Sequence, residues 1–416
     1  MPDELTFAVV GAGLAGAKAA EALRTEGFTG RIVLFGAEPH RPYERPPLSK
    51  GYLQGSAARD TVYVHRPEWY ADHQIDLRLG TAVTALDRRA HEIVTADGNR
   101  ERYDKLLLTT GATPRRLAVS GADLAGVHYL RSLDDSDQLK AALRPGTRVV
   151  IIGGGWIGLE TAAAARAAGA EVTVLEKGEL PLLRVLGPQV AQVFADLHTE
   201  NGVDLRCGVT AAAIRPAGTD PTTAGGVLLA DGTTLDADVI VVGIGVTPNV
   251  ELARSCRLNV DNGILVNRHL LTSDDDICAA GDVANAYHPL LRRQLRVEHW
   301  ANALHQPAVA AKTMLGKPAT YDRLPYFFTD QYDLGMEYTG YAQPDGHDEV
   351  VIRGDLHARE FIAFWLHDQR VVAGMNVNIW EVIEPIQELI RSGERVDAAT
   401  LADPDVPLAG LVTHLC

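Results

Sequence analysis

Two glycine-rich stretches of the chain have the residue types and spacing that hold phosphate groups. Both read Gly-x-Gly-x-x-Gly, at residues 11–16 and 153–158. The first glycine permits a tight turn, the second lets the backbone approach a pyrophosphate, and the third lets a helix pack closely on a strand. The N–H groups at the start of that helix attract the phosphate charge. The stretches therefore predict two dinucleotide sites, built on Gly11, Gly13, Gly16, Gly153, Gly155 and Gly158.

A carboxylate follows each glycine motif at the distance where a ribose would lie. Glu38 stands 22 residues after Gly16, at the end of the strand expected over 31–38, and Glu176 ends the strand expected over 171–176. A carboxylate at this place accepts hydrogen bonds from ribose hydroxyls. At the second site its charge would repel a 2′-phosphate, so we expect NAD(H) there rather than NADP(H).

The elements that position these motifs occur twice in the same order. In each half the motif follows an apolar strand and opens an alanine-rich helix, and an Asp-Gly pair later marks a hairpin, at 97–98 and at 231–232. Asp-Gly is typical of tight hairpins in which both turn residues have positive φ. A strand with a similar ending then follows, at 106–114 and at 240–248. We therefore expect two doubly wound α/β modules, each with an inserted antiparallel meander.

A smaller α+β domain is expected after about residue 322. Two alternating strands, EFIAFWL and RVVAGMNV, flank a polar HDQR turn. Before this domain, residues 296–315 are expected to form a helix that Pro307 would kink. The helix after the two strands has one apolar face, formed by Val382, Ile383, Ile386, Leu389 and Ile390.

The overall charge and the cysteines exclude several classes of protein. A formal net charge of −15 argues against a general binder of nucleic acid or of anionic membranes. The longest apolar run, 239–246, is too short to span a bilayer, and no leader is recognisable, so we expect a cytoplasmic protein. Cys207, Cys256, Cys278 and Cys416 lie too far apart for a redox dithiol, a disulfide framework or a metal site.

Two dinucleotide sites in one chain suggest two different redox cofactors. A nicotinamide carries a hydride and must come and go, whereas a flavin stays bound and can also pass single electrons. We therefore expect FAD at the N-terminal site and an exchanging NADH at the second site. Hydride would pass directly between them, without a covalent protein intermediate.

Longer motifs run through nearly the whole chain, from about residue 5 to about residue 390. They include PYERPPLSKGYL, TTGATPR, YLRS, GGGWIGLE, VGIGVTPN, AAGDVA, RVEHWANALHQ and FFTDQYD. As an ordered set they resemble the FAD-dependent NADH:ferredoxin reductases, which serve bacterial haem monooxygenases and aromatic-ring dioxygenases. The resemblance implies a tightly bound FAD and a glutathione-reductase-like α/β architecture with two Rossmann-like domains. It also implies domain boundaries: FAD domain 1–115 and 245–321, NAD domain 116–244, and C-terminal α+β domain 322–416.

The resemblance also assigns roles to single side chains. Lys50, after the stiff Pro46-Pro47 segment, would place a cation near the flavin ring, and Glu160 would orient the nicotinamide carboxamide. Phe328 stands where many relatives have tryptophan, so it keeps an aromatic face without an indole N–H, and we assign no electron-exit role to it. Besides the glycines and acids above, the cofactor-binding residues expected are Ala15, Arg45, Lys50, Val83, Thr110, Gly111, Arg131, Gly281, Asp282, Glu298, Trp300, Phe328, Trp156, Ile157, Glu160 and Gly245.

The expected electron acceptor is a small acidic ferredoxin of the [2Fe–2S] type. Arg292, Arg293 and Arg296 in the stretch LRRQLR form a candidate basic dock, or else a solvated turn. Because 41–50 contains no cysteine, dithiol reductases and the NADH oxidase and coenzyme A-disulfide reductase types are excluded. Rubredoxin reductase, monodehydroascorbate reductase and a redox-sensitive binding flavoprotein like apoptosis-inducing factor remain as alternatives. The net charge weighs against the last of these, because that type usually presents a basic surface to DNA.

Overall fold

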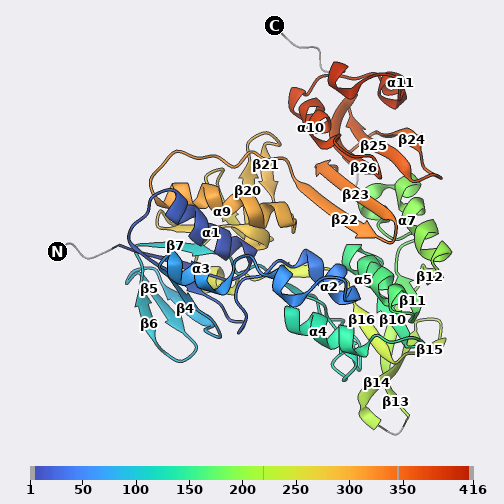
Figure 1. The fold of residues 1–416 in the computed structure, drawn as a ribbon, viewed down its shortest axis with the longest axis horizontal. Helices are drawn as coiled ribbons and strands as arrows, with labels where there is room; N and C mark the ends of the chain where they lie inside the picture. Colours follow the sequence, from blue (N-terminus) through green and yellow to red (C-terminus); the bar gives the residue numbers. More distant parts are fainter. Residues whose placement is uncertain (1–4, 219, 344–345, 412–416) are drawn as a thin grey trace. The chain divides into compact units, whose positions relative to one another are not determined.

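The computed structural model describes residues 5–218, 220–343 and 346–411. The chain folds into two compact units, each built from three segments (Figure 1). The segment 45–58 groups with unit 2, whereas the sequence assigns it to the first part of the FAD domain. The domain boundaries expected from the sequence stay a prediction. Unit 1 comprises Met1–Glu44, Arg59–Thr113 and Val246–Pro325, and unit 2 comprises Arg45–Ala58, Pro114–Gly245 and Tyr326–Cys416.

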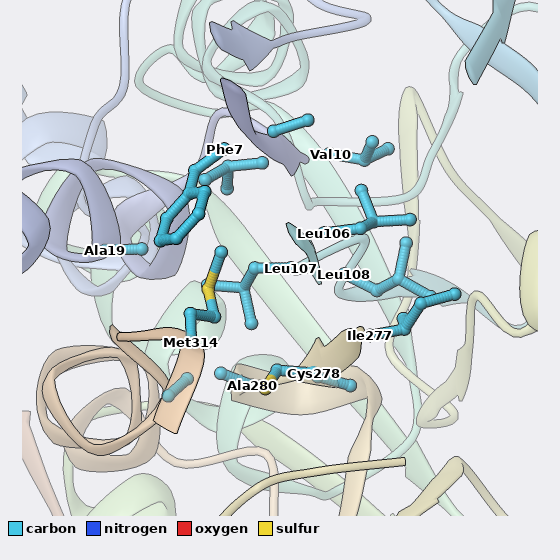
Figure 2. Close-up of a cluster of buried hydrophobic side chains, with 14 of the residues drawn as sticks. Phe7, Val10, Ala19, Leu106, Leu107, Leu108, Ile277, Cys278, Ala280 and Met314 are labelled. Atoms are coloured by element: carbon cyan, nitrogen blue, oxygen red, sulfur yellow. The ribbon is translucent and has the colours of Figure 1, made fainter. Parts of the chain in front are cut away.

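A parallel sheet of five strands forms the core of unit 1, in the order β3-β2-β1-β7-β19. Its central strands are continuous apolar runs, as is typical of strands buried on both faces. Figure 2 shows side chains of this sheet, among them Phe7, Leu107 and Cys278, in one cluster with Met314. The strands are β1 (Thr6–Val10), β2 (Arg31–Phe35), β3 (Ile75–Arg78), β7 (Lys105–Leu108) and β19 (Ile277–Ala279).

Two helices of unit 1 lie side by side against this sheet, α1 (Leu14–Thr25) and α9 (Trp300–Met314) (Figure 1). Helix α9 begins four residues later than expected and contains Pro307. The other helical segments are α3 (Pro67–Asp72), α8 (Glu251–Ser255), η2 (Arg59–Val62) and η3 (Gly281–Val283). The remaining strands are β4 (Val83–Asp87), β5 (Glu92–Thr95), β6 (Arg100–Arg102), β8 (Ala112–Pro114), β17 (Val246–Pro248), β18 (Ile264–Val266), β20 (Ala284–His288) and β21 (Arg293–Leu295).

Unit 2 contains a second parallel sheet of five strands, in the order β12-β11-β10-β16-β9. Helix α5 (Trp156–Ala167) follows the central strand, as α1 does in unit 1. The strands are β9 (Val127–His128), β10 (Arg148–Ile152), β11 (Glu171–Glu176), β12 (Asp204–Cys207) and β16 (Val239–Val242), with a meander of β13 (Ala211–Ala217), β14 (Asp220–Leu229) and β15 (Thr234–Asp236). The other helical segments are η1 (Pro46–Ser49), α2 (Gly51–Gln54), α4 (Leu133–Ala142), α6 (Leu183–Leu186) and α7 (Pro188–Glu200).

The two parallel sheets confirm the duplication that the sequence predicts. Each has its motif strand, β1 or β10, at the centre. In each, a three-stranded antiparallel meander precedes in the chain the strand, β7 or β16, that pairs with the motif strand on the side away from β2 or β11. The outermost strand differs in origin, because β19 comes late in the chain and β9 comes before the second motif.

Both Asp-Gly hairpins form, but their turns differ from the expected type. Gly98 and Gly232 have positive φ, whereas Asp97 and Asp231 do not. In each hairpin the glycine N–H bonds back three residues, and the Asp side chain accepts a backbone N–H two residues later. This is a type I turn followed by a left-handed glycine, so only one position needs positive φ.

The C-terminal part of unit 2 is an antiparallel sheet of five strands with a helix on it, where the sequence predicts two of the strands and the helix. The strand order is β22-β23-β26-β25-β24, and Ile386, Leu389 and Ile390 of α10 are buried. Among the described residues, no helix is long and apolar enough to cross a membrane. The elements are β22 (Tyr326–Gln331), β23 (Leu334–Gly340), β24 (Glu349–Asp355), β25 (Glu360–His367), β26 (Arg370–Val377), α10 (Ile383–Ser392), α11 (Ala398–Ala402) and η4 (Leu408–Gly410).

Candidate cofactor sites

The first glycine motif is closely packed at its outer two glycines. Gly11 has a φ of +117°, and a Cβ there would lie 2.2 Å from the carbonyl oxygen of Thr109. A Cβ at Gly16 would lie 2.0 Å from the carbonyl oxygen of Gly11. These contacts leave room only for glycine, as the tight turn and the helix–strand packing require.

The middle glycine of the same motif faces open space. No protein atom lies within 4 Å of a Cβ built on Gly13, and its φ of −89° is one that any residue adopts. Gly13 is also the N-cap of α1, and it offers no side chain to the N–H groups of the first turn. This open helix N-terminus fits a pyrophosphate, because the backbone can be approached and its N–H groups attract an anion.

Two segments distant in sequence come close to this motif. A Cβ on Gly281, at a φ of +78°, would lie 3.2 Å from the Cβ of Ala15, so η3 places Asp282 near the start of α1. The Gly281 N–H donates to Oε1 of Gln306 at 2.8 Å. Gln306 was not expected, and its position in the motif RVEHWANALHQ is the only sequence signal for it.

At the carboxyl end of β2 lie the residues that are expected to surround the ribose. That strand ends at Phe35, three residues before Glu38, so the carboxylate lies on the loop and not on the strand as expected. The backbone of this loop accepts the N–H of Gly80, which leads into β4 and Val83. The Tyr43 hydroxyl donates to the Glu38 carboxylate and fixes its direction.

Several other expected side chains of unit 1 have protein partners. The Trp300 Nε1–H donates to Glu44 at 3.2 Å, and Thr110 donates to the backbone of Asn249 at 2.8 Å, beside Gly111. Glu298 forms an ion pair with Arg296 at 2.5 Å. The side chain of Arg296 is only 7% exposed, so the structure contradicts its place in the basic dock. Its guanidinium is held inside the protein by Glu298, Asn262 and the carbonyl of Asp282.

The second glycine motif repeats the geometry of the first within unit 2. A Cβ on Gly153 would lie 2.4 Å from the carbonyl oxygen of Gly243, and one on Gly158 would lie 2.0 Å from that of Gly153. A Cβ built on Gly155, the N-cap of α5, would lie no closer than 4.0 Å, from the carbonyl oxygen of Gly243. Gly243 and its counterpart Thr109 were not expected, although both stand at the same place in the repeated strand endings.

The acid of the second motif is held firmly by backbone N–H groups. Oε2 of Glu176 accepts from Gly154 at 2.7 Å, and Oε1 accepts from Gly178 at 2.6 Å. Two such bonds fix the position of the carboxylate beside the motif. A 2′-phosphate placed here would meet that carboxylate directly.

Three further expected residues of this site differ in their surroundings. Ile157, in the first turn of α5, is 44% exposed. The Trp156 ring instead packs against Phe194 and Phe327, with ring centroids 5.5 and 5.1 Å away. Trp156 is half-buried at the edge of this aromatic cluster, so its place near the nicotinamide half stays a prediction. Gly245, at a φ of +97°, accepts the N–H of Arg115 through its carbonyl.

A buried ion pair lies at the start of α5. Nζ of Lys50 lies 2.7 Å from Oε1 of Glu160, and the two side chains are 15% and 5% exposed. Glu160 also accepts hydrogen bonds from Ser49 and, at 2.6 Å, from Thr329. The buried carboxylate therefore has three donors, as a polar group at this depth requires.

The surroundings of Lys50 include one aromatic ring and a second acid. Its Nζ lies 5.5 Å from the centroid of the Phe328 ring. Burial raises the pKa of Asp330, with Lys50 acting in the opposite direction. Upstream of Lys50, the Arg45 guanidinium donates to the carbonyl of Arg131, so these two expected residues meet.

Comparison with known proteins identifies the family. The pyridine nucleotide-disulphide oxidoreductase model matches residues 5–306, and the reductase C-terminal model matches 326–412. Putidaredoxin reductase of Pseudomonas putida is 38% identical over 407 residues, 97% of this chain and 96% of that protein. The ferredoxin–NAD(+) reductase component of the anthranilate 1,2-dioxygenase system of Burkholderia cepacia is 42% identical over 413 residues, 98% and 99% of the two proteins. The chain belongs to the putidaredoxin reductase-like ferredoxin–NAD(+) reductases.

The structural comparison agrees with this family. The crystal structure of the covalent putidaredoxin reductase–putidaredoxin complex matches with a TM-score of 0.94 at 38% identity, over 98% of both chains. The resemblance found from the motifs is therefore confirmed, and with it the fold class and the enzyme class, a ferredoxin–NAD(+) reductase. Membership implies FAD and NAD(H) as the reductase's cofactors and a ferredoxin as its partner.

Proposed function

We propose that this reductase passes electrons from NADH, through a tightly bound FAD, to an acidic [2Fe–2S] ferredoxin. That ferredoxin would in turn feed a haem monooxygenase or a ring-hydroxylating oxygenase. The observation that carries the proposal is the pair of glycine motifs, one in each unit, both tightly packed at the outer glycines and open at the middle glycine. The names of the relatives support the choice of a ferredoxin as acceptor.

In this proposal the first motif binds FAD. When bound, FAD accepts a hydride and releases its electrons one at a time. The open N-terminus of α1 at Gly13 would hold the pyrophosphate, and Glu38, oriented by Tyr43, would accept from the adenosine ribose. The remaining FAD contacts proposed are those of Gly11, Ala15, Gly16, Arg45, Lys50, Val83, Thr110, Gly111, Arg131, Gly281, Asp282, Glu298, Trp300 and Phe328.

The second motif would bind NADH. Gly155 would admit the pyrophosphate, and Glu176 would hold the ribose and repel a 2′-phosphate. The exposed face of Ile157 offers an apolar surface at the start of α5, where the nicotinamide half is expected. Gly153, Gly158 and Gly245 shape the backbone around it.

Lys50 and Glu160 would act through their charges. The Lys50 ammonium provides a fixed cation beside the Phe328 ring, suited to the negative charge that a flavin gains on reduction. Glu160 holds that ammonium in place and would offer its carboxylate to the nicotinamide carboxamide. Neither group needs to form a covalent bond, so their contribution is position and electrostatics.

The docking surface proposed for the ferredoxin is reduced to Arg292 and Arg293. Arg292 is exposed on the turn between β20 and β21, and Arg293 is partly exposed. A basic turn of this kind steers an acidic partner, and the effect weakens with salt.

The test is NADH-driven reduction of cytochrome c with and without candidate ferredoxins. The proposal predicts fast reduction that depends strongly on one ferredoxin and falls as salt is added. Equal rates with every ferredoxin and with none would overturn the proposed acceptor, while leaving the cofactor sites untouched.

A further inference from the structure

A row of buried side chains leads away from Glu160 and has no part in the reaction so far. Thr329 donates to Glu160 at 2.6 Å, and the Nε2 of Gln331 donates to Oγ1 of Thr329 at 3.2 Å. Oε1 of Gln331 lies 2.8 Å from Nε2 of His198. All four side chains are at most 5% exposed, so water does not compete for these bonds.

Two elements bring this row together. Thr329 and Gln331 are two residues apart on β22, so their side chains lie on the same face of the sheet. That face packs against α5, which carries Glu160, and Gln331 on it reaches His198 of α7. Phe328 and Asp330 point to the other face of the strand.

The protonation of His198 sets the direction of every bond in the row. Burial lowers the pKa of His198, so its ring is neutral near pH 7 and carries one N–H. Oε1 of Gln331 faces Nε2 of His198, while the Gln331 amide N–H donates to Thr329, so the ring proton is on Nε2 and donates to Gln331. Burial raises the pKa of Tyr332, so its hydroxyl stays protonated and can donate to Nδ1 at 3.4 Å.

The other tautomer of His198 would remove the hydrogen bond from Thr329 to Glu160. If the proton were on Nδ1, Nε2 would be an acceptor, and the Gln331 amide would turn to donate to it. The amide oxygen would then face Thr329 and draw its hydroxyl proton away from Glu160. A carboxylate buried at this depth loses stability when it loses a donor, because water cannot replace it.

We propose that His198 is a positioning residue of the reductase: through Gln331 and Thr329 it directs a hydroxyl onto Glu160 and so keeps the Lys50–Glu160 ion pair in one geometry. It acts on the proposed function without touching either cofactor. If the hydrogen bond from His198 affected only Gln331, it would stabilise the fold without changing the reaction. The rate of FAD reduction distinguishes these two roles.

The test compares His198→Phe, Thr329→Val and the double variant in the FAD-loaded protein. Each single change is expected to slow the reduction of FAD by NADH about fivefold and to shift the FAD midpoint potential. Thr329→Val removes the donor to Glu160, and His198→Phe removes the contact that fixes Gln331 and so the direction of the Thr329 hydroxyl. The double variant should be no slower than Thr329→Val alone, because His198 acts only through Thr329. Effects that multiply in the double variant would overturn the proposal.

A second measurement does not depend on catalysis. Nitrogen NMR of histidine-labelled protein should show His198 as the neutral Nε2–H form, and an Nδ1–H form would contradict the proposal. His198→Gln, whose amide N–H can still donate to Gln331, should keep most of the rate, which also serves if His198→Phe folds poorly. His128→Phe, at a half-buried histidine of β9, is the matched control and should leave rate and potential unchanged. If NADH does not reduce FAD at all in the parent protein, the proposed function fails. The NMR measurement of the His198 tautomer then tests by itself whether His198 donates to Gln331.

Discussion

Replacing Lys50 by methionine removes the cation from its ion pair with Glu160 and leaves the carboxylate buried. Breaking a buried pair from one side costs about 3–5 kcal/mol, since the remaining charge has lost its partner. Glu160 is 5% exposed and cannot reach water, but it keeps the hydroxyl donors of Ser49 and Thr329. We therefore expect the free energy of unfolding to fall by about 3 kcal/mol, the lower end of that range.

The partner variants make this prediction sharper. Glu160→Gln should cost less than Lys50→Met, because Lys50 is 15% exposed and its ammonium can turn to solvent. The double variant Lys50→Met with Glu160→Gln should recover about 2 kcal/mol of the Lys50→Met loss, since no unpaired charge remains.

The assay is urea unfolding followed by tryptophan fluorescence, together with stopped-flow reduction of FAD by NADH. We expect the double variant to regain stability but not the rate, because its cation is still missing. If Lys50→Met unfolds at the urea concentration of the parent, or if the double variant is less stable than either single one, the ion pair does not have the strength that its burial implies.

Three further predictions concern nucleotide choice, pH and docking. Glu176→Gln should raise the ratio of kcat/KM for NADPH to that for NADH about tenfold by removing the repulsive charge, and an unchanged ratio would contradict the role of Glu176. Burial lowers the pKa of His299 to about 4, against 6.5 when unfolded, so the unfolded chain binds a proton that the folded protein does not. The free energy of unfolding should therefore fall by about 3 kcal/mol as the pH drops from 6.5 to 4. In urea unfolding, the free energy of unfolding of His299→Gln should change less with pH than that of the parent protein. An equal change with pH in the two proteins would contradict this prediction. Arg292→Ala with Arg293→Ala should raise the KM for the ferredoxin and leave ferricyanide reduction alone, whereas equal effects on both acceptors would remove the dock.

The parts of the fold predictable from sequence are those with local signals. The glycine motifs stand between an apolar strand and a helix, and the Asp-Gly pairs stand between strand-like runs, so both duplicated modules follow from the chain alone. The turn type did not follow, because a left-handed glycine alone closes the hairpin at Gly98 and at Gly232.

The parts not predictable depend on contacts between distant residues. Arg296 belongs to a basic sequence, yet its guanidinium is held inside the protein by Glu298, Asn262 and the carbonyl of Asp282. Thr109 closes the first motif with a backbone carbonyl, which any residue would provide. The row from Thr329 to His198 joins a strand to a helix far away in the chain, and no spacing in the sequence marks it.

The proposed division of labour between the two motifs is tested most directly by the FAD content of Gly13→Ala and Gly155→Ala after gel filtration. Both positions have negative φ and open space for a methyl group, so both variants should fold. The methyl group would stand where a pyrophosphate is expected to lie. We predict that Gly13→Ala loses FAD, whereas Gly155→Ala keeps its FAD but is no longer bleached by NADH at the concentration that bleaches the parent. Full FAD content in Gly13→Ala, or loss of FAD from Gly155→Ala, would contradict one dinucleotide for each half of the duplicated fold.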